Sequence, residues 1–190
     1  MNSRIRKIFV WVIIFFVPVV CGQQLSVSSG QLNSIKFFAK STFSNFEGTT
    51  SSVEGFIKWD SAFTNNSKIE FKVYLDSLDT GIGLRNTHMR DNYLETNKYP
   101  IVLFTGKVIN QSYKTNFESE VGAEGILKIH GVERKQIIKG RLYDYGKLFK
   151  LESRFEISLS DFNIEQPSFL FISVDNDIVI ECTVYLTKEN

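Results

Sequence analysis

The residues that could do chemistry in this 190-residue sequence are few and lie far apart. The two histidines are His88 and His130, and Cys182 is the single cysteine beyond position 21. A zinc site needs about three or four clustered ligands, and nucleophilic catalysis needs a base beside the nucleophile. The spacing brings no such set together. We therefore expect no catalytic residues, no metal and no cofactor, and a protein that is not an enzyme; a hydrolase or isomerase built around the two histidines is the remaining alternative.

The sequence around Cys182 and His130 favours structural roles for both. Cys182 is in phase with the alternating apolar residues of "IVIECTVYL", which predicts a small buried side chain on one face of a strand. His130 precedes Gly131 and is out of phase with Leu127 and Ile129. This position predicts a partly exposed histidine at a strand end, hydrogen-bonded to the turn.

The stretch "LDSLDTG" contains two carboxylates, Asp76 and Asp79, which could be interpreted as a catalytic pair. A structural role explains them better, because short polar side chains bond to nearby backbone groups where a strand ends. We expect Asp79 and Thr80 to organise this strand exit, with Gly81 adopting a positive φ.

The first residues, "MNSRIRKIFVWVIIFFVPVVCGQQ", have the features of a secretory signal. A basic start is followed by an apolar run over residues 8–20, which is shorter than the roughly 18–20 residues of a spanning helix. We expect cleavage after Gly22, a periplasmic or secreted location, and one domain over residues 23–190. The alternative is a lipoprotein with Cys21 as its lipidated first residue, although Val20 fits such a site poorly.

The charge balance argues against a nucleic-acid partner. Loss of Arg4, Arg6 and Lys7 with the signal reduces Lys+Arg from 22 to 19 against 21 Asp+Glu, so the mature chain carries about −2. Charges of both signs are interspersed, and the basic stripe that phosphate backbones require is missing from the sequence.

Alternation of apolar and polar residues dominates the rest of the chain and predicts strands. In "KIEFKVYLDSL" the apolar residues at 69, 71, 73 and 75 alternate with polar or tyrosine side chains, and "SIKFFAK", "AEGILKIHG" and "FEISLSDF" behave similarly. The segment "VDND" between "FLFIS" and "IVIECTVYL" predicts a hairpin turn.

One segment, about 84–94, favours a helix. Leu84, His88 or Met89, and Tyr93 recur at nearly helical spacing, and Pro100 forbids continuation beyond Tyr99. Either Thr80 or Asp79 is expected to cap the start of this helix.

Many strands with one apolar face each, and a single short helix, predict an all-β fold: an antiparallel barrel or a sandwich. Barrels of about eight strands either fill their interior with side chains or enclose one small ligand. The high content of Phe, with 17 residues, suits both an enclosed apolar space and a filled core.

Three linked motifs resemble the YceI-like, or polyisoprenoid-binding, family of bacterial periplasmic proteins. They are "SLDTG", "LRNTHMRDNYLETNKYP" and "GILKIHGV", which occur in the family's order and at fitting intervals across nearly the whole mature chain. The resemblance implies a lipocalin-like antiparallel β-barrel around an elongated apolar cavity. It also implies isoprenoids or other long-chain amphiphiles as ligands, and no established catalytic residues.

The sequence departs from the family pattern at several positions. The early histidines common in the family are absent from "NSIKFFAKSTFSNFEGTTSSVEG", so no role of theirs carries over. Lys128 stands where the family usually has Thr, and Met89 where it has Leu. In these respects the chain is similar to a subgroup whose barrel mouth is less polar.

The expected function is non-catalytic binding or transport of a polyisoprenoid or other fatty-acyl type lipid, without nucleic acid or metal. The alternative is a filled barrel that acts as a structural or protein-interaction module, and a homodimer is left open. Thirteen in-phase or helical apolar side chains are expected to line the cavity: Phe37, Ile57, Phe71, Val73, Leu84, Met89, Tyr93, Val102, Phe104, Leu127, Ile129, Phe155 and Ile157.

Overall fold

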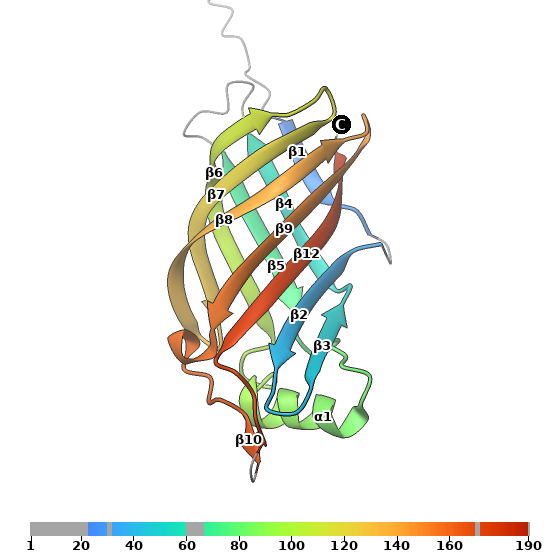
Figure 1. Ribbon diagram of the computed structural model, residues 1–190. Coiled ribbons are helices and arrows are strands. Elements are labelled where there is room, and N and C mark those ends of the chain that lie inside the picture. Colours follow the sequence, from blue (N-terminus) through green and yellow to red (C-terminus); the bar gives the residue numbers. More distant parts are fainter. Residues whose placement is uncertain (1–22, 30–31, 60–66, 170–171, 190) are drawn as a thin grey trace, which may run out of the picture.

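Eight antiparallel strands close into a barrel in the computed structural model, which describes residues 23–29, 32–59, 67–169 and 172–189 (Figure 1). The expected signal and Cys21 therefore lie outside the described residues. No helix in the described part is long and apolar enough to cross a membrane. In pairing order the barrel strands are β1 (Gln23–Val27), β4 (Val53–Trp59), β5 (Lys68–Tyr74), β6 (Ile101–Tyr113), β7 (Glu118–Ile129), β8 (Val132–Asp144), β9 (Leu148–Ser158) and β12 (Asp177–Lys188).

The barrel closes where β12 meets β1, with Leu186 opposite Val27. The other half of the same edge of β12, Val179–Thr183, pairs instead with β2 (Ser34–Lys40), which continues into β3 (Asn45–Thr50). The β2–β3 hairpin thus extends the wall at one end of the barrel. The predicted antiparallel barrel of about eight strands is confirmed.

Alternation along the strands separates the interior from the surface, because successive side chains point to opposite faces of a sheet. In β5 the side chain of Ile69 is buried, and Lys72 on the other face forms an ion pair with Glu70 at 3.1 Å. The polar and apolar faces that the sequence predicts for this strand are therefore the outer and inner faces of the barrel.

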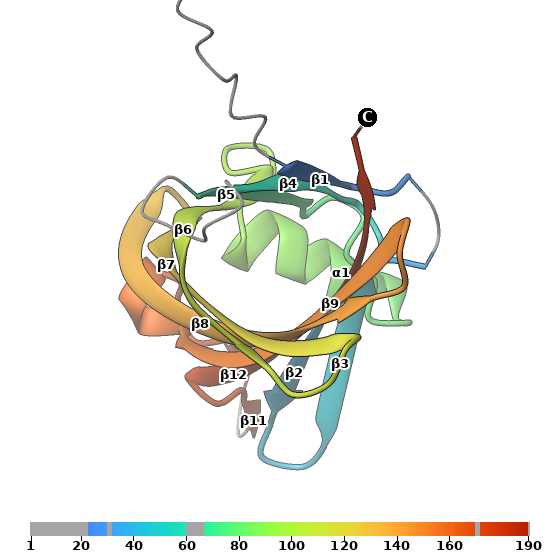
Figure 2. The same cartoon turned by 90° about the horizontal axis from the view of Figure 1, so that it is seen from above.

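The single predicted helix is present as α1 (Gly83–His88) followed by a π-helical turn, η1 (Met89–Tyr93). It lies across one opening of the barrel, beside the turn between β2 and β3 (Figures 1 and 2). We call this opening, with α1 and residues 41–44, the helix end.

The predicted cap of this helix is wrong. Its N-cap is Ile82, which makes no side-chain capping bond. Gly81, at φ 77°, turns the chain so that Thr80 and Asp79 lie beside the first turn and contact the side chain of Asn86. The expected positive φ at Gly81 is confirmed.

Asn86 holds this strand exit together from its buried position in α1. Its Oδ1 accepts bonds from Thr80 N at 2.8 Å and Thr80 Oγ1 at 2.6 Å, and its Nδ2 donates to Asp79 Oδ1 at 2.6 Å. The bond from Asn86, with a second from Gly81 N, holds the pKa of Asp79 below its usual range because both stabilise the carboxylate.

The hairpin predicted at "VDND" is also wrong. The short strand before it, β11 (Ile172–Ser173), pairs with β10 (Ser168–Phe169), and Val174 bridges to Ser41. Residues 174–177 instead lead into β12, whose two edges are already occupied by β9 and by β2 with β1. No edge of β12 is left for a hairpin partner.

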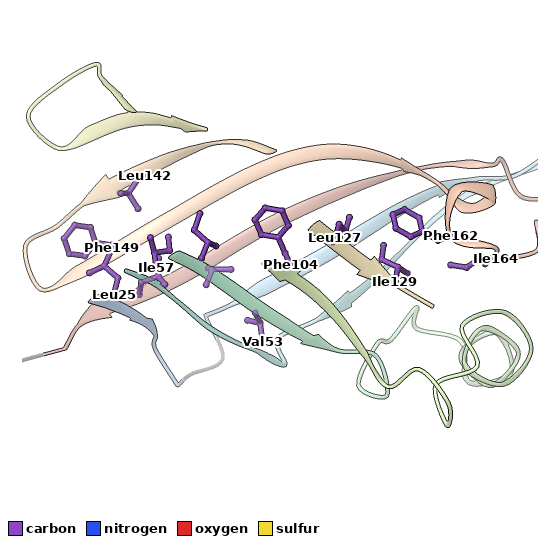
Figure 3. Packing of buried hydrophobic residues seen from close by; sticks show 13 residues of the cluster. Leu25, Val53, Ile57, Phe104, Leu127, Ile129, Leu142, Phe149, Phe162 and Ile164 are labelled. Atoms are coloured by element: carbon purple, nitrogen blue, oxygen red, sulfur yellow. The ribbon is translucent and has the colours of Figure 1, made fainter. Parts of the chain in front are cut away.

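Buried side chains are found at both ends of the barrel (Figure 3), but the two ends differ in the elements that border the interior. At the end opposite α1, Leu25 and Leu186 are fully buried and pack in one cluster with Phe149 and Leu142. We call this the closed end. At the helix end the interior is bordered by α1, η1 and the 3₁₀ helix η2 (Leu159–Phe162).

Candidate functional site

A cavity of about 670 Å³ occupies the barrel interior, and its wall is almost wholly apolar. Side chains from β2, from β4 to β9, from β12 and from both turns of the helical segment contribute to it. Its volume lies within the range of about 300–1,000 Å³ that is usual for small-molecule sites. The exposed residues Ile82 and Leu84 are part of the wall, so the cavity reaches solvent beside α1.

The structure places all thirteen predicted residues on the wall of this cavity. The strand residues meet there because one face of every barrel strand points inward: Phe71 of β5 is directly opposite Phe104 of β6, which in turn is opposite Leu127 of β7. In the helical segment, Met89 and Tyr93 are partly buried, whereas Leu84 is 68% exposed at the opening.

Several wall residues were not predicted. Ile178, Ile180 and Cys182 of β12 share the alternation of the predicted residues, so the same pattern could have found them. Ile164 follows η2 and lies outside any strand, so no periodicity points to it. Arg85 reaches the wall from α1, and a search for apolar side chains at helical spacing does not find a basic residue.

Cys182 is half-buried and its side chain borders the apolar cavity, so the prediction of a buried side chain is only partly met. It lies on the cavity wall, and burial raises the pKa of its thiol to about 11, because the apolar surroundings disfavour the thiolate. Since only the thiolate is a good nucleophile, this thiol is poorly suited to catalysis at neutral pH.

Labelling of Cys182 is expected to be slow and to be blocked by anything that fills the cavity. In a chain that begins at Gln23, where Cys182 is the single cysteine, the rate of reaction with a neutral maleimide should rise about tenfold per pH unit up to about pH 10. Saturating long-chain lipid should reduce this rate strongly, as followed by mass spectrometry. Equal rates with and without bound lipid would show that the lipid lies elsewhere.

His130 has a different structural role from the predicted one. Its Nε2 lies 2.7 Å from Glu95 Oε2 and its Nδ1 lies 3.3 Å from the carbonyl oxygen of Phe162, while the ring of Tyr99 packs edge-on at 4.5 Å between centroids. The ring therefore fastens the β7–β8 turn to the segment after η1 and to η2, instead of bonding its own turn. The prediction failed because both partners are distant in sequence.

The two histidines do not form a common site. His88 is an exposed residue of the cavity opening, whereas His130 is not part of the wall. Within the residues that the structure describes, no group of three or more His, Cys, Asp or Glu side chains gathers in a way that could hold a metal ion. What the described geometry offers is an apolar cavity that reaches solvent beside α1.

Solved structures with the same fold are similar to this chain over most of its length. A domain from Saccharophagus degradans, described as a polyisoprenoid binding domain implicated in plant cell wall breakdown, has a TM-score of 0.69 at 14% identity, covering 87% of this chain and 98% of that one. Burkholderia cenocepacia BcnA has a TM-score of 0.66 at 15% identity, covering 80% and 95%. The Campylobacter jejuni YceI protein has a TM-score of 0.58 at 22% identity, covering 78% and 88%.

At the level of sequence, the UPF0312 protein of Pseudomonas syringae pv. tomato (strain ATCC BAA-871 / DC3000) is 27% identical over 146 residues, which are 73% of this chain and 74% of that protein. The profile of the YceI-like domain matches residues 27–186, from Val27 at the end of β1 to Leu186, its pairing partner in β12. The chain belongs to the YceI-like domain family.

Proposed function

We propose that this protein binds a long-chain amphiphile, a polyisoprenoid or another lipid, in the barrel cavity and carries it without chemical change. The single observation that carries the proposal is the apolar cavity of about 670 Å³, open beside α1. The Saccharophagus degradans relative, described as polyisoprenoid binding, supports an isoprenoid as one candidate. The thirteen predicted wall residues are the proposed contacts.

The proposed location is the periplasm or the outside of the cell, with residues 1–22 removed as a secretory signal and residues 23–190 as the mature domain. The support is the basic and apolar pattern of the first residues, together with the resemblance of the sequence motifs to a family of bacterial periplasmic proteins. The homodimer stays a prediction.

Burial of the alkyl chain supplies the binding energy. Each methylene removed from water contributes roughly 0.8 kcal/mol, so ten buried carbons contribute about 8 kcal/mol against an association cost of about 4 kcal/mol or more. The wall provides few hydrogen-bonding groups below its opening, so the interior favours ligands with a long apolar chain. A filled barrel acting only as an interaction module is disfavoured, because its interior would leave no such volume.

The affinity for a series of fatty acids of about 8 to about 18 carbons tests this proposal. We expect the dissociation constant to fall by up to about fourfold per added methylene and then to level off, because carbons beyond the cavity stay in water. Calorimetric titration of the full chain measures it.

Affinity that is independent of chain length, or no binding anywhere in the series, would contradict a cavity site. Lys72→Ala is the matched control on the outer face of β5, since Lys72 pairs with Glu70 at the surface. It should leave the whole series unchanged.

A further inference from the structure

The charged side chains on the cavity wall have one sign. Among the wall residues that the structure describes, the basic groups are Lys36, Arg85 and His88, and none is a carboxylate. The chain as a whole has nearly equal numbers of acidic and basic residues, 21 against 22. A wall with basic groups and no acidic ones therefore differs from the rest of the molecule.

Within this set, Lys36 and Arg85 differ in their acidic partners. Lys36 forms an ion pair with Glu47 at 3.3 Å. For Arg85, in contrast, no carboxylate of the described residues lies within 4.0 Å of a guanidinium nitrogen. A partly buried cation beside an apolar cavity gains from an anionic partner, because the low-dielectric surroundings strengthen the pairing.

The guanidinium group of Arg85 is nevertheless held in one place. Its Nε donates to Thr80 Oγ1 at 2.8 Å and its Nη2 donates to the Thr80 carbonyl oxygen at 2.7 Å, while its Cζ atom lies over the Phe46 ring, 4.5 Å from the ring centroid. Thr80 is itself fixed by buried Asn86. Nη1 donates to no atom of the described residues, so one edge of the fork stays available in a preorganised position.

We propose that Arg85 binds the anionic head group, a carboxylate or a phosphate, of a single-chain amphiphile whose tail lies in the cavity. The inference rests on the proposed function and narrows its ligand class. Its geometry follows from the opening: the tail passes exposed Leu84 into the barrel, and the head group stays beside α1. The guanidinium fork suits both oxyanions because it can donate two parallel bonds to either.

Binding of three ligands with the same alkyl chain tests the head group: hexadecanoate, hexadecyl phosphate and hexadecanol. In the full-length protein we expect Arg85→Gln to lower the affinity for both anionic ligands at least about tenfold, because a charge-assisted hydrogen bond is lost. The affinity for hexadecanol should change by less than about twofold, since this ligand has the same alkyl chain but no anionic head group. Arg85→Lys keeps the positive charge but not the guanidinium fork. Its affinity for the two anions should lie between that of the unmodified protein and that of Arg85→Gln.

Arg90→Gln is the matched control on the neighbouring turn. Arg90 donates to the Asp76 carbonyl oxygen and is not a wall residue, so all three affinities should be unchanged. Continued binding of hexadecanol by Arg85→Gln shows that this variant is folded.

Three outcomes overturn the assignment. If all three ligands bind the unmodified protein and Arg85→Gln weakens none of them selectively, the head-group role fails while the lipid-binding function stands. If no ligand binds, both fail. If inorganic phosphate alone binds at Arg85 as tightly as hexadecyl phosphate, the site serves a free anion and not a lipid head group.

Discussion

Replacing Leu186 by alanine is expected to lower the free energy of unfolding by about 2–5 kcal/mol. Leu186 is fully buried at the closed end and lies opposite both Phe149 of β9 and Val27 of β1. The change therefore removes packing at the seam where the barrel closes. Urea unfolding followed by far-UV circular dichroism measures the effect.

Thr187→Ala is the matched control for this prediction. Thr187 is the next residue of β12, so its side chain points to the other face of the sheet, and the expected loss is within about 1 kcal/mol. Equal losses in the two variants would contradict the assignment of the inner face and of the closed end.

Replacing Phe71 by aspartate is expected to abolish lipid uptake, with affinity reduced at least about hundredfold. Phe71 lies on the cavity wall opposite Phe104, so its loss removes apolar contact that contributes roughly 1.5–3 kcal/mol. The new carboxylate must also lose water when a tail enters, which adds a further cost because the apolar tail offers it no hydrogen bond in exchange. Titration with a fluorescent fatty acid measures uptake.

Two further variants separate this effect from misfolding. Lys72→Ala, on the outer face of the same strand, should bind lipid normally. Phe71→Ala keeps the interior apolar and should retain weakened binding with a cooperative thermal transition. Normal uptake by folded Phe71→Asp, or equal loss in Lys72→Ala, would contradict the proposed binding face.

The strands and their inner faces were predictable from the sequence because side-chain direction in a strand has a period of two. Phe71 and Ile129 illustrate this: their positions in an alternating run predicted an inward direction, and both lie on the cavity wall. The helix was predictable for a similar reason, since its apolar residues recur at helical spacing.

Features that depend on contacts between distant segments were not predictable. Glu95 and Phe162, the partners of His130, are 35 and 32 residues away. Both edges of β12 are occupied, which rules out the "VDND" hairpin, and this occupation depends on how the whole barrel closes. The size of the cavity depends on that closure as well, and composition alone left a filled core and an open cavity equally compatible with the high content of Phe.

The family motifs acquire physical roles in the structure. The Asp-Thr-Gly motif ends in a turn at Gly81, and its first two residues hold Asn86 and Arg85 of α1 through hydrogen bonds. The motif that contains His130 ties the β7–β8 turn to η2 and to the segment after η1. Both motifs therefore position the helical segment over the opening of the cavity.

Organic extraction of the purified full-length protein tests the central claim most directly. After exposure to a total bacterial lipid extract and repurification, the protein should release about one long-chain amphiphile per chain, identified by mass spectrometry. Folded Phe71→Ala should release less, and folded Phe71→Asp should release none. A wild-type extract with no lipid above that of Phe71→Asp would contradict the claim that the barrel is a lipid-binding site.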